Sequence, residues 1–514
     1  GMNVVRMNTA HASREGFEAL IANVRAVSNR IAILMDTKGP EVRTTANADP
    51  ILYQIGEKVK IVGDPDRETT RECIAVSYPN FVHDLNVGGT ILIDDGDLEL
   101  RVIDKTTEYL LCEVQNEATL GSRKSVNVPG VRINLPSLTE KDRNNILYAI
   151  EKDIDFIAHS FVRNRQDVLD IRGILDAHNS DIRIIAKIEN QEGVDNIEEI
   201  LEVSDGIMVA RGDLGVEIPP EEVPLVQKAL IALANRRGKP VITATQMLES
   251  MVKSPRPTRA EANDVANAIF DGSDAIMLSG ETAMGKYPCE AVATMARIAE
   301  KTESSINYGK NLTKSLETGL TNITNAISFA ACTTAAELKT TCISTITKSG
   351  FTARMISKHR PVCPIAAGTM CDQVWRQMNL VWGCRPVLHK APISKGQVFD
   401  SAMKVAQKSG LVKNGDTIVM ALGMPVGVSG STNTLRVDIV GDVLCKGIGV
   451  GKQRVSGTAR VIKVRDEMER EFKKGDILVT TATDNDFMPY LQKASAIVVG
   501  PMDHVENCHA AVSY

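Results

Sequence analysis

The sequence predicts an α/β protein built on a (β/α)8 TIM barrel, and three observations lead to this fold class. Short apolar runs alternate with segments whose apolar residues recur at helical spacing, as in a parallel sheet with crossover helices. Most of these runs start ~24 to 34 residues after the previous one, which is the size of a βα unit. They also end in polar residues, as expected where strand ends surround an active site.

Seven apolar runs are expected to be barrel strands, and six segments between them are expected to be amphipathic helices. The strands are residues 2–8, 30–37, 154–161, 182–189, 206–213, 240–246 and 274–281. The helices are residues 138–152, 167–178, 196–203, 223–237, 259–270 and 291–301. Because a barrel of this type has eight strands, we expect the natural protein to carry one further βα unit upstream of residue 1.

A long interval between residues 37 and 154 breaks this rhythm and predicts an inserted domain. It is rich in branched apolar residues and turn signals, which favours short β-strands. These strands are residues 58–62, 73–76, 90–93, 98–103 and 109–114. We therefore expect a small β-barrel domain at 44–131, inserted at the barrel mouth where it can act as a lid. The catalytic barrel then comprises 1–43 and 132–308.

The chain after residue 308 predicts two more domains. A helix at 323–338 followed by short strands favours an α/β domain at 309–443. Its strands are residues 342–347, 363–367, 385–388, 417–421 and 435–440. From residue 444 to 514 a glycine-rich segment, with strands at 475–479 and 494–499, predicts a partial β/α tail domain.

The composition indicates a large globular protein and excludes several classes of function. With 514 residues, 43% of them hydrophobic, the chain can bury several cores. A formal net charge of −5 and dispersed basic residues argue against a nucleic-acid partner. Neither an apolar run of membrane-spanning length nor a secretion leader occurs, so we expect a cytoplasmic protein without a membrane partner. The ten cysteines form no Cys-x-x-Cys motif, which fits a reducing compartment.

Charged residues end two consecutive predicted strands. Lys187 and Glu189 end the run at 182–189, and Asp213 ends the run at 206–213. In a parallel barrel these ends meet at one open mouth. Two carboxylates there would repel each other unless a cation lay between them, and Mg²⁺ accepts one or two carboxylates while leaving sites for substrate oxygens. The ammonium of Lys187 suits an anionic, phosphorylated substrate.

Several longer motifs occur along the chain. They are Asn3-Val4-Val5-Arg6-Met7-Asn8, Met35-Asp36-Thr37-Lys38-Gly39-Pro40-Glu41-Val42-Arg43, Lys187-Ile188-Glu189-Asn190-Gln191-Glu192-Gly193, Ala210-Arg211-Gly212-Asp213-Leu214-Gly215, Ala244-Thr245-Gln246-Met247-Leu248-Glu249-Ser250 and Met277-Leu278-Ser279-Gly280-Glu281-Thr282. In these motifs the chain resembles the pyruvate kinase family, from residue 1 to about residue 440. The resemblance implies a subunit with a catalytic barrel, a lid and an effector domain, commonly assembled as a homotetramer. It also implies the last step of glycolysis, in which the phosphoryl group of phosphoenolpyruvate passes to ADP, giving ATP and pyruvate.

The resemblance implies roles for residues that handle the phosphoryl group. Glu189 and Asp213 resemble the carboxylates that bind Mg²⁺ (or Mn²⁺). Lys187 resembles the cation that neutralises charge developing on the transferred group. Arg6 and Ser160 are expected to contact the substrate phosphate, for which a guanidinium is well shaped.

The resemblance also implies which residues bind the carboxylate and enolate of the first substrate and the phosphates of the nucleotide. The amides of Gly212 and Asp213 are expected to bind the substrate carboxylate if they open a helix. Thr245 resembles the threonine that orders a proton-donating water beside the enolate, because a threonine hydroxyl is itself a poor acid. Arg43 and Lys141 resemble contacts to the phosphates of the nucleotide.

A monovalent cation site is implied as well, with one departure from the family. The residues that resemble potassium ligands are Asn8, Asp36 and Thr37, and Glu41 is the residue that accompanies potassium dependence. Where the family usually reads Asn-Phe-Ser-His, this chain has Ala10 in place of the serine. Ala10 offers no side-chain ligand, so we expect activation by K⁺ through a weakened site.

Two further sites are expected beyond the barrel. Thr347, Lys348, Ser349, Gly350 and Thr352 follow a strand and open a predicted helix, a pattern typical of a phosphate-binding loop and similar to the family's effector loop. A sugar phosphate is the expected effector, and residues 423–433 lie where a second effector loop is expected. The tail resembles a phosphohistidine domain, with His509 as the candidate phosphohistidine.

Two other functions remain open from the sequence. A Mg²⁺-dependent barrel aldolase or lyase acting on 2-keto acids also pairs a glutamate with an aspartate on successive strands, but it gives no reason for the inserted domain, Arg43 or Lys141. A non-catalytic phosphorelay or sensor protein would use the tail as its active part. The presence of Lys187, Glu189 and Thr245 together argues against that second alternative.

Overall fold

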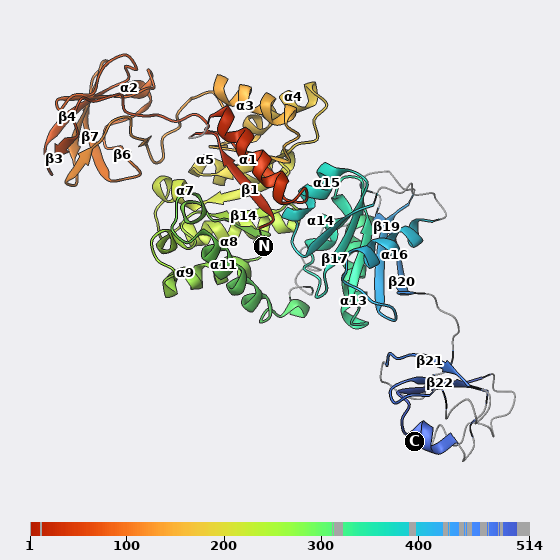
Figure 1. Cartoon of the computed structure of the whole chain (residues 1–514). Coiled ribbons are helices and arrows are strands. Elements are labelled where there is room, and N and C mark those ends of the chain that lie inside the picture. The colour runs from red at the N-terminus through yellow and green to blue at the C-terminus, as the bar shows by residue number, and fades with distance from the viewer. Residues whose placement is uncertain are drawn as a thin grey trace. The chain divides into compact units, whose positions relative to one another are not determined.

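The computed structural model of the chain describes residues 2–10, 13–310, 312, 322–389, 397–424, 430, 432–441, 447, 449, 455–462, 470, 472–481, 483 and 487–500. The chain divides into two compact units. The large unit comprises Gly1–Val412 and Thr417–Asp438, and the small unit comprises Lys413–Asp416 and Ile439–Tyr514. Figure 1 gives the course of the chain, from red at the N-terminus to blue at the C-terminus.

The large unit is organised around a parallel sheet of seven strands, here named the main sheet. Its order is β1-β2-β11-β12-β13-β14-β15, so barrel strands that follow one another in the chain also pair in the sheet. Each strand lies within one of the seven predicted runs, and the curled sheet is consistent with a partial barrel (Figure 1). The strands are β1 (Val4–Asn8), β2 (Ala32–Asp36), β11 (Phe156–His159), β12 (Arg183–Ile188), β13 (Gly206–Ala210), β14 (Val241–Ala244) and β15 (Ala275–Ile276).

Burial on both faces explains the near-continuous apolar sequences of these strands. Every residue of β2 and of β13 is buried. Successive side chains enter different cores: Ile33 packs in a hydrophobic cluster with Phe17, whereas Leu34 belongs to a second cluster with Phe156. Since both faces are covered, the one polar residue of β2, Asp36, stands at its end.

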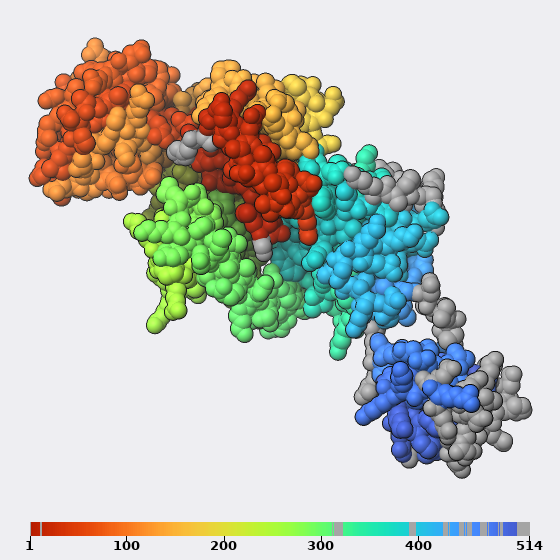
Figure 2. Space-filling model, in the orientation of Figure 1, coloured from red at the N-terminus to blue at the C-terminus, as the bar shows by residue number. Residues whose placement is uncertain are grey.

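Helices connect the strands of the main sheet, and all six predicted helices are present. Thr139 and Thr258 start two of them with capping boxes, which satisfy amide groups of the first turn. Helix α1, in red at the surface in Figure 2, was not predicted, nor were the short α5, α7 and α10. The helices are α1 (Arg14–Val27), α3 (Glu140–Glu151), α4 (Arg165–Ala177), α5 (Gln191–Asp195), α6 (Ile197–Val203), α7 (Arg211–Glu217), α8 (Val223–Arg237), α9 (Arg259–Asp271), α10 (Gly280–Ala283) and α11 (Pro288–Glu303), with the 3-10 helix η1 (Glu249–Val252).

Between β2 and α3 the chain forms an inserted β domain with a hydrophobic core of its own. Its larger sheet has the order β10-β6-β7-β8-β4-β5, and β3 pairs with β9 in a smaller sheet. The five predicted strands are present, whereas the two- and three-residue strands β3, β9 and β10 were not predicted. The elements are β3 (Ile51–Tyr53), β4 (Lys58–Val62), β5 (Cys73–Ala75), α2 (Phe81–Asp84), β6 (Thr90–Ile93), β7 (Leu98–Lys105), β8 (Leu110–Val114), β9 (Ala118–Leu120) and β10 (Val126–Asn127).

The last part of the large unit is an α/β domain with a sheet of order β18-β17-β16-β19-β20. Arg376 of this domain connects it to the main sheet, because Nε donates to Oδ1 of Asp155 at 2.6 Å and Nη2 donates to Oδ2 of Asp153 at 2.6 Å. The elements are α13 (Ile323–Glu337), β16 (Cys342–Ile346), α14 (Phe351–Ser357), β17 (Ile365–Thr369), α15 (Asp372–Gln377), η2 (Met378–Leu380), β18 (Cys384–Leu388), α16 (Val398–Lys408), β19 (Thr417–Gly423) and β20 (Thr432–Ile439).

In the small unit, the described residues contain a three-stranded parallel sheet with the order β21-β22-β23. Its elements are β21 (Ala459–Val461), β22 (Ile477–Thr480), α18 (Met488–Leu491) and β23 (Ala496–Val499). Across both units, no helix within the described part of the chain has the length and apolar character needed to span a bilayer.

Candidate active site

The main sheet gathers most of the predicted site residues at one edge, because the carboxyl ends of parallel strands face the same way. Lys187 is the penultimate residue of β12 and pairs in register with Met208 of β13, while Asn8 at the end of β1 pairs with Asp36 at the end of β2. The remaining residues follow these strands directly. They are Ser160 after β11, Glu189 after β12, Gly212 and Asp213 after β13 and Thr245 after β14.

A buried group of charges occupies this edge. Nζ of Lys187 lies 2.9 Å from Oε1 of Glu189 and 3.3 Å from Oδ1 of Asp36. On its other side, Asp36 accepts a hydrogen bond of 2.6 Å from Nε of Arg6. The side chain of Lys187 is 10% exposed, and those of Asp36 and Glu189 are 1% and 0% exposed. Water screens these four groups little, so they interact strongly with one another.

The pKa values of the group follow from this geometry. Burial alone would raise the pKa of Asp36, but the charges of Lys187 and Arg6 outweigh burial and lower it. Burial would lower the pKa of Lys187, yet the carboxylates of Asp36 and Glu189 raise it, so the ammonium stays charged. Burial raises the pKa of Glu189 to about 7, since the attraction of Lys187 is partly offset by repulsion from the nearby Asp213.

Glu189 and Asp213 suit a hard divalent cation. Oε2 of Glu189 accepts a hydrogen bond from the Phe161 amide at 2.6 Å. Oε1 is buried and, among the described residues, receives no hydrogen bond of good geometry despite the nearby ammonium. Asp213 lines the adjoining cleft. No cluster of three or more His, Cys, Asp or Glu side chains suitable for a metal occurs in the described part of the chain, so a cation here would take its other ligands from substrate and water, as Mg²⁺ does.

Ser160 and Thr245 are engaged with the protein rather than directed freely into solvent. Oγ of Ser160 donates to the carbonyl of Thr37 at 2.7 Å and accepts from Nζ of Lys187 at 2.8 Å. Oγ1 of Thr245 accepts from the amide of Gly212 at 2.8 Å and donates to the carbonyl of Ala244 at 2.7 Å. The amide of Gly212 therefore holds the hydroxyl of Thr245.

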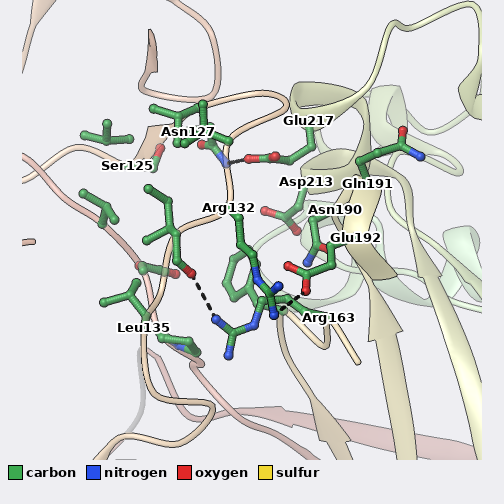
Figure 3. Close-up of a pocket in the computed structure, with 18 of the residues that line it drawn as sticks. Ser125, Asn127, Arg132, Leu135, Arg163, Asn190, Gln191, Glu192, Asp213 and Glu217 are labelled. Carbon is green, nitrogen blue, oxygen red and sulfur yellow. Dashed lines mark hydrogen bonds and ion pairs between the residues drawn. The ribbon is translucent and has the colours of Figure 1, made fainter. Parts of the chain in front are cut away.

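A cleft of about 740 Å³ adjoins this edge, lined by the inserted β domain and by loops of the main sheet (Figure 3). A contact between the two sides crosses it, because Nδ2 of Asn127, in β10 of the inserted domain, donates to Oε1 of Glu217 in α7 at 2.8 Å. Nη2 of Arg132, just after the inserted domain, lies 3.1 Å from Oε1 of Glu192. The cleft can therefore enclose a ligand between the two sides.

Of the two predicted nucleotide residues, only Arg43 lines the cleft. Its Nε donates to Oε2 of Glu41 at 2.6 Å. Lys141 is exposed in the first turn of α3 and is not among the lining residues. Lys124, which lines the cleft and pairs with Asp94 at 2.7 Å, was missed from the sequence. No motif distinguishes Lys124, since only the folded β domain brings it to the cleft.

The predicted potassium ligands are already occupied by protein partners. Oδ1 of Asn8 accepts from the amide of Ala10 at 2.9 Å, and Oγ1 of Thr37 accepts from the amide of Ser160 at 3.1 Å. Asp36 pairs with two cationic side chains, as described above.

The predicted effector loop precedes α14 in the α/β domain. Gly350 has a φ of 75°, a left-handed conformation that favours glycine. The carbonyl of Ser349 accepts from Nη2 of Arg183 at 3.2 Å, and Oγ1 of Thr352 is paired with Oγ1 of Thr432 at 2.9 Å. His509 lies outside the described residues, as does much of the predicted second loop.

Comparisons with known proteins agree with the resemblance in the sequence. The family model "Pyruvate kinase, barrel domain" matches residues 1–292, and "Pyruvate kinase, alpha/beta domain" matches residues 325–438. The chain is 49% identical over 506 residues to the pyruvate kinase of Geobacillus stearothermophilus, with 97% of this chain and 86% of that protein covered. It is 49% identical over 511 residues to the Bacillus licheniformis pyruvate kinase, with the same coverage of both chains.

A comparison with solved structures also finds a pyruvate kinase. The crystal structure of a pyruvate kinase from Cryptosporidium parvum matches with a TM-score of 0.80 and 39% identity, covering 86% of this chain and 91% of that one. These matches favour the kinase over the aldolase or sensor alternatives.

Proposed function

The chain belongs to the pyruvate kinase family, and from this premise we propose that its reaction centre is the buried group of Lys187, Glu189, Asp36 and Arg6 together with Asp213 and Thr245. The activity is transfer of the phosphoryl group of phosphoenolpyruvate to ADP, giving ATP and pyruvate. The observation that carries the assignment is the ammonium of Lys187, held between two carboxylates in a site that is almost inaccessible to water.

A divalent cation completes this centre, with Glu189 and Asp213 as its carboxylate ligands. When bound, Mg²⁺ or Mn²⁺ draws negative charge from the transferred phosphoryl oxygens. Support comes from the buried Oε1 of Glu189 and from the repulsion that Asp213 exerts on it. A cation bound by both carboxylates would give Oε1 of Glu189 a partner and would offset the repulsion from Asp213.

Lys187 and Arg6 act on the phosphoryl group itself. As the bond from phosphorus to the enol oxygen breaks, negative charge stays on the enolate and on the transferred group, while a nucleotide oxygen forms the new bond. A fixed ammonium in a dry site stabilises that charge without reorganisation. Arg6 is 26% exposed, so its guanidinium can bind substrate phosphate while its Nε remains on Asp36.

Thr245 acts in the second step of the reaction, the protonation of the enolate. The enolate accepts a proton at its terminal carbon to become pyruvate, and the hydroxyl of Thr245 orders the water that donates it. Gly212 takes part by holding that hydroxyl through its amide. Ser160 acts as a bridge between Lys187 and the end of β2.

The cleft is the nucleotide site, and the inserted β domain is its lid. Arg43 and Lys124 offer cations to the ADP phosphates from one side of the cleft. Lys141, exposed outside the cleft lining, is retained as a candidate that would reach the nucleotide only after closure of the lid.

K⁺ is proposed as an activator that acts weakly, because Asn8, Asp36 and Thr37 already have protein partners.

The remaining proposals concern organisation and regulation. We propose a cytoplasmic homotetramer whose subunit has the catalytic barrel at 1–43 and 132–308, the lid at 44–131, the effector domain at 309–443 and the partial phosphohistidine-like domain at 444–514. The loop at residues 347–352 would bind a sugar phosphate. The tail would be a packing or regulatory module, with His509 as its candidate phosphohistidine.

The test of the proposed reaction is a comparison of substrates. With Mg²⁺ and K⁺ present, the protein should form ATP from phosphoenolpyruvate and ADP, and it should not cleave 2-keto acids that an aldolase would accept. ATP formation that persists with a chelator in excess over all divalent cations would contradict the role given to Glu189 and Asp213. Cleavage of a 2-keto acid without ATP formation would support the aldolase alternative.

A further inference from the structure

The turn that carries Thr245 is strained. Thr245 has a φ of 70° and Gln246 a φ of 53°, so two consecutive residues adopt the left-handed conformation after β14. For a β-branched residue this conformation is an energetically unfavourable outlier. Such a turn persists only where its surroundings hold it, so the contacts that hold this one decide where the Thr245 hydroxyl lies.

The side chain of Arg211 provides most of these contacts. Its Nη2 donates to the carbonyl of Thr245 at 2.6 Å, and its Nε donates to the carbonyl of Ala244 at 3.1 Å. Nη2 also lies 2.9 Å from Sδ of Met247, further along the same turn. One guanidinium therefore contacts three of the four residues in the turn at 244–247.

A carboxylate anchors this guanidinium from the opposite side. Nη1 and Nη2 of Arg211 donate to Oδ1 and Oδ2 of Asp264 in α9, each at 2.7 Å. The Arg211 side chain is 12% exposed. Its charge is compensated and its donors are used within the protein, so it is poorly placed to bind substrate. Its geometry instead fits a brace between α9 and the turn, for which the planar fork of arginine is suited.

Gly212, the residue after Arg211, holds the same turn from the backbone. Its amide donates to Oγ1 of Thr245 at 2.8 Å, and that hydroxyl donates in turn to the carbonyl of Ala244. The side chain of Arg211 thus fixes the carbonyls of the turn, while the amide of Gly212 fixes the hydroxyl.

We propose that Arg211, anchored by Asp264, is a positioning residue for the proton-transfer step, because it holds the strained turn that orients the hydroxyl of Thr245. This inference rests on the proposed role of Thr245. It predicts that loss of Arg211 affects protonation of the enolate more than transfer of the phosphoryl group, since Lys187, Glu189 and Arg6 make no contact with the turn in the hydrogen bonds and ion pairs of the described residues.

The two steps can be measured separately. In D₂O with Mg²⁺, K⁺ and ATP, a methyl C–H bond of pyruvate breaks, its proton passes to the water beside Thr245, and its electron pair remains on the enolate until a deuteron returns. Proton NMR of the methyl group follows this exchange. Formation of ATP from phosphoenolpyruvate and ADP, read with a coupled assay, follows phosphoryl transfer. The ratio of the two rates is the readout.

The variants are Arg211→Lys and Asp264→Asn. Asp264→Asn keeps Arg211 in place, so it tests the proposal even if Arg211→Lys does not fold. The matched control is Arg360→Lys, since Arg360 is also 12% exposed and pairs with Asp274 at 2.9 Å, at the boundary with the α/β domain. We expect methyl exchange to fall roughly tenfold to a hundredfold in Arg211→Lys, which is part of the ~10²- to 10⁴-fold that positioned proton transfer contributes, with a much smaller fall in ATP formation. Arg360→Lys should leave the ratio of the two rates unchanged.

Equal falls of both rates in Arg211→Lys, or normal exchange in both Arg211→Lys and Asp264→Asn, would overturn the positioning role. Normal exchange in Thr245→Ala would contradict the proposed role of Thr245 and, with it, this inference. A wild-type chain that forms no ATP would contradict the proposed function itself, and the two failures are therefore distinguishable.

Discussion

Lys187 and Glu189 lie two residues apart at the end of β12, and their charged atoms are 2.9 Å apart with the carboxylate fully buried. Nζ of Lys187 also lies 3.3 Å from Oδ1 of Asp36, at the end of β2. One ammonium is therefore shared by two buried carboxylates. Arg6 compensates Asp36, but Asp213 adds a third carboxylate that repels Glu189, so a metal cation would complete the balance of charge.

The pH dependence of metal binding should follow Glu189. Its pKa is raised to about 7, chiefly by burial, so below pH 7 a proton must leave before Mg²⁺ binds. We expect apparent Mg²⁺ affinity to weaken about tenfold for each pH unit below 7 and to level off above it. Calorimetric Mg²⁺ titrations at pH 6, 7 and 8 would measure this.

Glu189→Gln provides the control for that titration, because glutamine does not ionise. We expect Glu189→Gln to bind Mg²⁺ more weakly than the wild type, with an affinity that changes little across the same pH range. If the wild-type affinity were equally flat, the perturbed carboxyl would not be a metal ligand.

Arg376→Met should destabilise the large unit. The guanidinium is 9% exposed and donates to Asp155, a carboxylate that is 0% exposed. Without Arg376, the buried Asp155 keeps only Arg25, 3.6 Å away, as a cationic partner among the described residues, and breaking a buried pair costs up to about 3 to 5 kcal/mol. Urea unfolding followed by circular dichroism would measure the loss.

The matched variant is Arg165→Met, which breaks the exposed pair with Glu202, where the side chains are 46% and 53% exposed. An exposed pair contributes about 0 to 1 kcal/mol. Similar losses in Arg376→Met and Arg165→Met would argue that the contact with Asp155 does not stabilise the fold.

Ala10→Ser should strengthen activation by K⁺. The substitution restores a hydroxyl beside Asn8, whose side-chain oxygen now accepts from the amide of Ala10 at 2.9 Å. We expect the ratio of rates in K⁺ and Na⁺ buffers to be small in the wild type and several-fold larger in the variant. An unchanged ratio would mean that this position does not contribute to a cation site.

Much of the main sheet could be predicted because buried parallel strands leave a strong signal: an apolar run that ends in a polar residue. All seven strands lie within the predicted runs. The strands β3, β9 and β10 have only two or three residues and were missed, whereas the equally short β5 and β15 lie within longer apolar runs that were predicted.

The individual charges at the site could be predicted, but not their partners. Sharing of Lys187 between Glu189 and Asp36 depends on the register of β2, β11 and β12, which the sequence pattern does not specify. The interactions of Arg211 were missed for the same reason, because its partners come from another turn and from α9. Nor did any local pattern reveal that Thr245 has a positive φ.

The most direct test of this account is the rate of ATP formation from phosphoenolpyruvate and ADP by the wild type, Lys187→Met and Lys239→Met. Lys239 is a matched control, because it is a half-buried lysine that donates to the carbonyl of Ser204 at 2.6 Å, near the start of β14 and away from the site. The account predicts a fall in kcat of roughly a thousandfold in Lys187→Met alone, since Lys187 acts on charge that develops in the transition state. A kcat in Lys187→Met close to that of Lys239→Met would contradict it.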